Sequence, residues 1–218
     1  AKDNVILGHT RLAIIDLAAG QQPFADASGS RILVYNGEIF NFREIRSELV
    51  KKGHTFKTDC DTEAVLASYL EWGEDCLHHF NGFFAFAVAD FAERRIFAAR
   101  DRLGLKPLIY ARNNAGFALA STTPSVITLL GMSPSPDLEA VSHYISTGRT
   151  NFGQKTLVRD VFSLPPAHKL SISMDDASSL KTSRWWSRPV MSKAEKQAAS
   201  VPFEKAVEQI RALIDESV

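Results

Sequence analysis

Four residues of this chain carry the groups needed to hold an amino acid and to stabilise an oxyanion. Asn36 offers a side-chain amide N–H and Gly37 an unobstructed backbone N–H, a donor pair suited to the oxyanion of an acyl-transfer reaction. Arg11 carries a planar guanidinium, which pairs with a carboxylate through two hydrogen bonds. Asp61 can accept hydrogen bonds from an ammonium group. We therefore predict that Arg11 and Asp61 hold the two charged ends of the substrate.

Each of these residues also has a structural interpretation when it is considered alone. An Asn-Gly pair after the apolar run Ile32-Leu33-Val34 is typical of a turn, because both residues tolerate positive φ. A lone arginine is most often on the surface or in an ion pair, and Asp61 stands where a helix N-cap is expected. Only the combination of these residues argues for a site.

Acyl transfer also needs a nucleophile, and the two cysteines are poor candidates. Cys60 is not N-terminal and has no adjacent base, so we do not expect it to attack a substrate. Neither Cys60 nor Cys76 lies in a C-x-x-C pair, and reduced thiols are expected. Cys76 precedes Leu77-His78-His79, but the spacing matches no compact zinc pattern, so no metal site is predicted.

Composition limits the class of protein. The chain has 218 residues, 45% of them apolar, which is enough for a real core. Its 25 Lys and Arg balance 25 Asp and Glu, so no basic excess argues for nucleic acid or a membrane surface. No apolar run approaches the roughly 20 residues of a membrane span, and the N-terminus lacks the zones of a signal peptide. We expect a cytoplasmic globular protein that binds a small molecule or another domain.

Apolar spacing predicts the elements that must position these residues. We expect strands at 5–8, 11–17 and 31–35, a helix from Asn41 to Gly53, and a second helix from Asp61 to near Gly73. Residues 83–89 and 95–99 are predicted to form a hairpin that is buried on both faces, and 108–111 with 117–120 a second hairpin.

After the second hairpin, the sequence predicts shorter elements separated by polar and proline-containing stretches. Short helices are predicted from Pro124 to Leu130 and from Asp137 to Gly148, and a strand at 169–173 is followed by a polar turn. The polar stretch 187–200 suits a linker, and 201–218 forms an amphipathic helix. Together with Trp185 and Trp186, this helix indicates a surface normally covered by another domain.

Six segments with distinctive residues occur in order along the chain. They are Gly8-His9-Thr10-Arg11-Leu12-Ala13-Ile14-Ile15-Asp16-Leu17, Gln22-Pro23, Tyr35-Asn36-Gly37-Glu38-Ile39-Phe40-Asn41, Asp61-Thr62-Glu63, Asn81-Gly82-Phe83-Phe84-Ala85-Phe86-Ala87 and Arg100-Asp101-Arg102-Leu103-Gly104-Leu105-Lys106-Pro107-Leu108. This order resembles the class II glutaminase domain of the asparagine synthetase (glutamine-hydrolysing) family. The resemblance extends from about residue 5 to the tryptophan pair and includes Leu164-Pro165-Pro166-Ala167-His168.

The resemblance implies an α+β fold of the N-terminal nucleophile hydrolase type, an αββα sandwich of two antiparallel sheets covered by helices. It implies that an N-terminal cysteine attacks the side-chain amide of glutamine and that ammonia passes to a second domain. By motif match it assigns a substrate-pocket strand to Arg11, Leu12 and Ile14. It assigns an oxyanion and substrate loop to Asn36, Gly37 and Glu38, and an amino-group ligand to Asp61.

The resemblance also implies parts that the chain does not carry. The nucleophilic cysteine would lie upstream of Ala1, and the pyrophosphate loop of the synthetase domain is not in this sequence, so the chain alone is expected to be inactive. The domains implied are a glutaminase domain at 1–186, a linker at 187–200 and the first synthetase helix at 201–218. No cofactor is implied for these residues, whereas ATP and Mg²⁺ are implied for the absent domain. The implied partners are glutamine and the synthetase domain of the same polypeptide, and a homodimer stays open.

Two functions remain open at this point. One is the glutaminase domain of an asparagine synthetase-like, ATP-dependent amidotransferase; the other is a non-catalytic scaffold, as in β-lactam synthetase-like enzymes. Thr122 and Pro124 depart from the family, which commonly has Ala-Ser-Glu followed by Lys here. Arg100-Asp101-Arg102 is predicted to be a structural turn in which the opposite charges satisfy each other.

Overall fold

The structure, a computed structural model, describes residues 4–10, 21–150, 152–190, 192 and 200–217. The chain divides into two compact units, Ala1–Trp186 and Ser187–Val218. None of the helices in these described ranges is long and apolar enough to cross a membrane.

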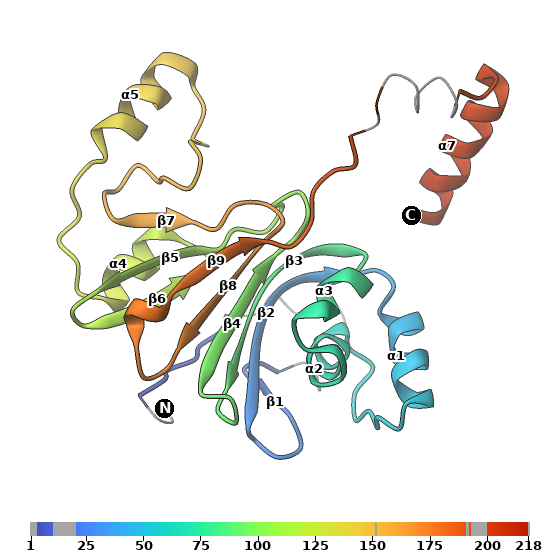
Figure 1. Cartoon of the computed structure of the whole chain (residues 1–218), viewed down its shortest axis with the longest axis horizontal. Helices are drawn as coiled ribbons and strands as arrows, with labels where there is room; N and C mark the ends of the chain where they lie inside the picture. Colours follow the sequence, from blue (N-terminus) through green and yellow to red (C-terminus); the bar gives the residue numbers. More distant parts are fainter. Residues whose placement is uncertain (1–3, 11–20, 151, 191, 193–199, 218) are drawn as a thin grey trace. The chain divides into compact units, whose positions relative to one another are not determined.

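Two antiparallel sheets organise the first unit (Figure 1). The larger sheet has the order β1-β2-β3-β4-β8-β9, formed by Phe24–Ala25, Arg31–Ile39, Gly82–Asp90, Arg95–Arg100, His168–Ser173 and Lys181–Arg184. The smaller sheet has the order β6-β5-β7, formed by Gly116–Ala120, Ile109–Asn113 and Val161–Ser163. Two antiparallel sheets with helices confirm the predicted α+β sandwich.

Alternation of side chains along the strands builds the layers. On β2, Leu33, Tyr35 and Ile39 face one way and join a buried cluster with the helices that cover this face. Between the two sheets lies a second cluster, to which β3 and β4 contribute alanines: Ala85, Ala87 and Ala98. A third cluster joins the smaller sheet to α4, Thr123–Leu129. Figure 1 shows the same order, with α1 to α3 on the outer face of the large sheet and α4 beyond the small one.

The predicted helices near the site are confirmed. Helix α1, Phe42–Lys51, buries Ile45 and Leu49 and is followed by Gly53 at positive φ. Helix α2, Asp61–Trp72, ends at Gly73 and is buried along most of its length. A short 3₁₀ turn η1, Gly73–Asp75, leads into α3, Cys76–His79.

The hairpins and the later helices also match the prediction. Strands β3 and β4 are buried on both faces through most of their length, and β5 and β6 form the second hairpin. Helix α5, Leu138–Thr147, begins at the cap Asp137 and ends at Gly148 in the left-handed conformation. The polar turn after β8 contains a 3₁₀ turn, η2, Ala177–Ser179. In the second unit α7 spans Phe203–Ser217, and its apolar residues Phe203, Ile210 and Leu213 are exposed.

Some predictions of elements and surfaces are wrong or lie outside the described residues. Residues 6–8 are in no regular strand, and 11–17 fall outside the described ranges. Trp185 does not form an exposed surface: it is 8% exposed, stacks on Phe84, and its indole N–H donates to the Arg100 carbonyl at 3.0 Å. Trp186 packs against the same core cluster.

Candidate functional site

Asn36, Gly37 and Glu38 lie inside strand β2, and Gly37 pairs with Phe84 of β3. The prediction of a loop or turn at this pair is therefore wrong. The turn preference of Asn-Gly is local, and pairing along nine residues of β3 overrides it. The three residues are half-buried and held in a rigid element.

Gly37 is required here by the closeness of β3. A Cβ atom on Gly37 would lie 2.3 Å from the Phe83 carbonyl oxygen and 2.7 Å from the Phe84 Cα. A Cβ on Gly82, in the facing strand, would lie 2.1 Å from the Glu38 carbonyl oxygen. The two glycines therefore allow β2 and β3 to approach closely beside the predicted oxyanion residues.

The register of the ladder sets the direction of the Gly37 N–H. Phe84, opposite Gly37, accepts at its carbonyl from the Asp101 N–H at 2.8 Å and donates its N–H to the Asp101 carboxylate at 3.3 Å. Its backbone groups therefore point away from β2. Because opposite residues in an antiparallel pair either bond each other or both point outward, the Gly37 N–H points away from β3.

Two neighbouring N–H groups of β2 point to the same side and have side-chain partners. The Tyr35 N–H donates to Gln22 Oε1 at 2.6 Å, and the Ile39 N–H donates to Asp61 Oδ2 at 3.2 Å. Gln22 Nε2 also donates to the Tyr35 carbonyl at 2.9 Å, so this side chain pairs with β2 as a strand residue would. The Gly37 N–H thus lies on the same side of β2, between the Tyr35 N–H that binds Gln22 and the Ile39 N–H that binds Asp61.

Asp61 is the first residue of α2, but it is not the cap. Cys60 occupies the N-cap position, and no side chain caps this helix. The Asp61 carboxylate instead accepts from the Tyr35 hydroxyl at 2.6 Å and from the Ile39 N–H. Both bonds end on Oδ2, and Oδ1 accepts none from the described residues. The predicted N-cap role is therefore wrong, and within the described part of the chain Oδ1 is left without a hydrogen-bond donor.

Glu63 fixes the segment that leads into α2. Its buried carboxylate accepts from the Thr58 N–H and hydroxyl, each at 2.7 Å, and from the Lys57 N–H. Asp59 pairs with Arg46 of α1. The backbone before Asp61 is therefore held by side chains from both helices.

The other predicted site residues divide into two groups. The side chains of Asn36 and Glu38 lie on β2, and neither hydrogen-bonds to any of the described residues. Arg11, Leu12 and Ile14 lie outside the described residues. The structure therefore brings Asn36, Gly37, Glu38 and Asp61 onto β2 and the adjoining start of α2.

Both cysteines are buried and free of disulfides. Cys60 contacts the Thr58 hydroxyl at 3.0 Å, and burial raises the pKa of the Cys76 thiol well above its ordinary value. His79 stacks on Trp72, and in the described ranges no three His, Cys, Asp or Glu residues are grouped as metal ligands would be. Neither thiol has the setting of an activated nucleophile.

The segment Arg100-Asp101-Arg102 is structural, but its charges do not pair with each other. The buried Asp101 carboxylate accepts from four backbone N–H groups, those of Phe84, Leu103, Leu105 and Lys106. Arg100 donates to the carbonyls of Gly104, Lys106 and Leu164, and Arg102 to that of Phe80. The predicted mutual neutralisation is corrected: backbone groups satisfy each charge.

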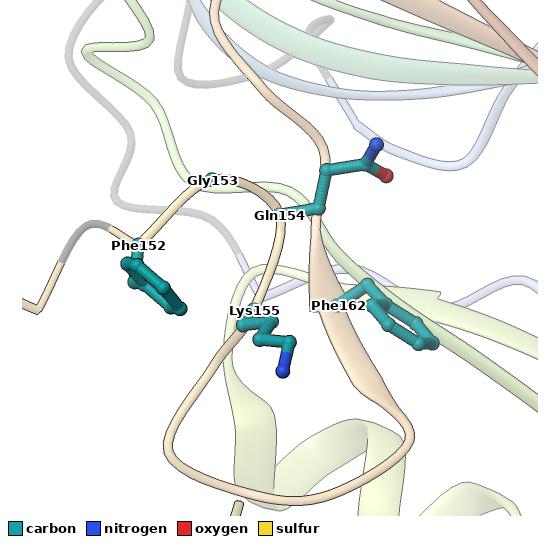
Figure 2. Close-up of a pocket in the computed structure, with 5 residues that line it drawn as sticks. All are labelled: Phe152, Gly153, Gln154, Lys155 and Phe162. Atoms are coloured by element: carbon teal, nitrogen blue, oxygen red, sulfur yellow. The ribbon is translucent and has the colours of Figure 1, made fainter. Parts of the chain in front are cut away.

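An open cavity of 410 Å³ lies elsewhere, on the loop before β7. Phe152, Gly153, Gln154, Lys155 and Phe162 line it, and Figure 2 shows the two rings on either side of the Lys155 side chain. Lys155 bonds Glu139 at 2.5 Å, and Gln154 accepts from the Tyr110 hydroxyl at 3.0 Å. The polar groups here are engaged in holding the loop, so this cavity offers no catalytic group.

Sequence reasoning missed Tyr35 and Gln22. Tyr35 precedes the Asn-Gly pair, and Gln22 belongs to the Gln22-Pro23 segment, but no local pattern indicates that they bind Asp61 and β2 across 26 and 13 residues. The one available signal was that both residues belong to the six segments that occur in order along the chain.

Comparison with known proteins agrees with this geometry. Residues 1–186 match the family described as "Glutamine amidotransferase domain". The chain is 35% identical to "Asparagine synthetase [glutamine-hydrolyzing] 3" of Bacillus subtilis (strain 168) over 99% of its own length and 34% of that protein. It is 41% identical to "Putative asparagine synthetase [glutamine-hydrolyzing]" of Mycobacterium bovis over 66% of its length and 23% of that protein. The chain thus spans about a third or less of these relatives.

A solved structure shares the fold. It is the glutamine phosphoribosylpyrophosphate amidotransferase from B. subtilis complexed with ADP and GMP, with a TM-score of 0.54 and 18% identity. The match covers 77% of this chain and 32% of that one.

Proposed function

Because the chain belongs to the glutamine amidotransferase domain family across residues 1–186, we propose that it hydrolyses glutamine and supplies ammonia within an asparagine synthetase-like enzyme. The observation that carries this proposal is the row of groups on the outer side of β2. There the Gly37 N–H points away from β3, and Asp61 is bound to the same strand at Ile39.

This arrangement matches the needs of glutamine hydrolysis. The α-ammonium of glutamine binds Asp61 through Oδ1, and the oxyanion formed from the side-chain amide accepts from the Gly37 N–H and the Asn36 side chain. Asn36 and Gly37 are consecutive, so their two donors leave adjacent points of the strand. Arg11 binds the α-carboxylate, while Leu12, Ile14 and Glu38 complete the pocket; this part of the proposal rests on the motif match.

The remainder of the protein supplies the acceptor chemistry. Since the chain spans 34% of its asparagine synthetase relative, we assign ATP and Mg²⁺ to a synthetase domain in the same polypeptide. The described residues would then serve one half-reaction only, release of ammonia from glutamine. The covalent attack requires a nucleophile that neither described cysteine is placed to provide.

The test is hydrolysis by the natural polypeptide that contains this chain. Glutamate and ammonia release are measured against glutamine concentration for the wild type and for Asn36→Ala and Asp61→Asn. Loss of an oxyanion donor should lower kcat about a hundredfold with little change in KM, whereas Asp61→Asn should chiefly raise KM.

The scaffold alternative makes the opposite prediction. If the wild type releases no glutamate and calorimetry detects no glutamine binding, the domain is a support and the proposal is wrong. If both variants hydrolyse glutamine as fast as the wild type, the proposed location of the site at β2 is wrong.

A further inference from the structure

A tyrosine hydroxyl holds the carboxylate predicted to bind substrate. Tyr35 is 4% exposed, and its hydroxyl donates to Asp61 Oδ2 at 2.6 Å. Ile39, four residues along the same strand, donates its N–H to the same oxygen at 3.2 Å. Asp61 is therefore tied to β2 on both sides of Gly37.

We propose that Tyr35 is a positioning residue for glutamine recognition: its hydroxyl fixes the Asp61 carboxylate so that Oδ1 faces the α-ammonium group of the substrate. This inference rests on the proposed function. It adds a residue that does not touch the substrate and that acts only through Asp61.

The need for such a residue follows from the freedom of an aspartate side chain. The last torsion of Asp is broad, so a carboxylate bound by one backbone N–H alone can still rotate. A second donor on the same oxygen restricts this rotation and leaves the other oxygen in a fixed place. The Asp61 side chain therefore loses its rotational entropy when the protein folds, and glutamine binding does not have to order it again.

The hydroxyl keeps its proton in this setting. Burial, and then the negative charge of Asp61, raise the pKa of Tyr35 far above its ordinary value of 10.0. The neutral hydroxyl is therefore available to donate its hydrogen bond to Asp61.

The hydrogen bond between Tyr35 and Asp61 also connects the proposed ammonium-binding carboxylate to the strand that carries the oxyanion donors. Because Tyr35 directly precedes Asn36, any shift of Asp61 at α2 is resisted by the strand that carries the oxyanion donors. A purely structural tyrosine would stabilise the fold but would not distinguish one end of the substrate from the other.

The experiment compares glutamine with 4-carbamoylbutanoate, which is glutamine without its α-amino group. Ammonia release from both compounds is measured with the natural polypeptide, as wild type and as Tyr35→Phe. This substitution keeps the ring in the core and removes only the hydroxyl. We expect kcat/KM for glutamine to fall about tenfold, mainly through KM, and that for the des-amino compound to change less than about twofold.

Tyr69→Phe is the matched control. Tyr69 is 3% exposed in the same core cluster, and its hydroxyl donates to another carboxylate, that of Asp90, at 3.2 Å. It lies eight residues after Asp61 in α2, about 12 Å along the helix axis. Its loss should reduce stability without changing the ratio of the two kcat/KM values.

The outcomes separate the two proposals. If the wild type neither hydrolyses nor binds glutamine, the proposed function fails and this inference fails with it. If the wild type prefers glutamine but Tyr35→Phe lowers both compounds equally, or lowers neither, the function stands and the positioning role is overturned. A selective loss for glutamine in Tyr35→Phe alone supports it.

Discussion

Replacement of Gly37 by alanine tests the close approach of β2 and β3. The new Cβ would lie 2.3 Å from the Phe83 carbonyl oxygen, whereas non-bonded contacts are comfortable at about 3.5 Å. The strands must therefore separate by about 1 Å at this point, because the obstructing atoms belong to the backbone and cannot rotate away.

The magnitude follows from the flanking ladder. Glu38 and Phe83 form an adjacent pair whose N–H and carbonyl groups face each other, and an extra 1 Å takes hydrogen bonds of about 2.9 Å beyond bonding distance. Two lost bonds at about 1 kcal/mol each, with about 1 kcal/mol of overpacking strain, give a loss of about 3 kcal/mol in the free energy of unfolding. For a domain of this size the midpoint of thermal unfolding should fall by roughly 6–12 °C.

Urea unfolding followed by circular dichroism measures this loss. Gly82→Ala should behave like Gly37→Ala, because its Cβ would lie 2.1 Å from the Glu38 carbonyl oxygen on the same ladder. Gly8→Ala is the neutral control, since its Cβ would meet no atom of the described residues within 4 Å. A Gly37→Ala variant within about 0.5 kcal/mol of the wild type would refute the argument from close approach.

Three further substitutions test other contacts. Gln22→Ala removes both hydrogen bonds to the Tyr35 backbone and should cost about 2 kcal/mol of stability in urea titration; an unchanged midpoint would mean that this amide does not support β2. Asp101→Asn places an amide N–H among four backbone donors and should cost about 2–4 kcal/mol, seen as a lowered melting temperature; wild-type stability would contradict this bonding pattern. Burial alone would raise the pKa of Glu74, but bonds and charges from Lys169 and Arg95 outweigh it and lower the pKa below the ordinary 4.5. Its stabilisation is therefore complete above pH 4.5 and is lost as the pH falls from there through the native pKa, so Glu74→Gln should flatten acid unfolding in this window. An unaltered acid profile would exclude Glu74 as a contributor.

Local sequence signals predicted the elements that depend on local chemistry. Helices α1 and α2 follow from apolar spacing and from glycines at or just beyond their ends, and the β3–β4 hairpin follows from two apolar runs around a polar turn. The ordered segments predicted the sandwich that these elements form. The three-residue strand β7 was missed, because so short a strand has no measurable periodicity.

The errors concern contacts between distant parts of the chain. Asn36-Gly37 has the local preference of a turn, but Gly82 on the facing strand makes room for a close ladder. Asp61 has the chemistry of a cap but stands one residue after the cap position, and Tyr35 binds its carboxylate from 26 residues away. Trp185 was expected at a surface, but its indole reaches the carbonyl of Arg100. No pattern within a short window carries this information.

The order of strands in the large sheet has a consequence for synthesis of the protein. Strand β4 pairs with β3 on one side and with β8 on the other, and β8 begins at His168, long after β4 ends at Arg100. At a translation rate of about 5–20 residues per second, the intervening stretch takes roughly 3–14 s to emerge. During that interval the edge of β4 that later pairs with β8 has no partner, and Ala98 lacks Leu170 and Ile172, its neighbours in the cluster between the sheets. Completion of the large sheet therefore waits for β8, and until then the free edge of β4 is a template on which another chain could pair.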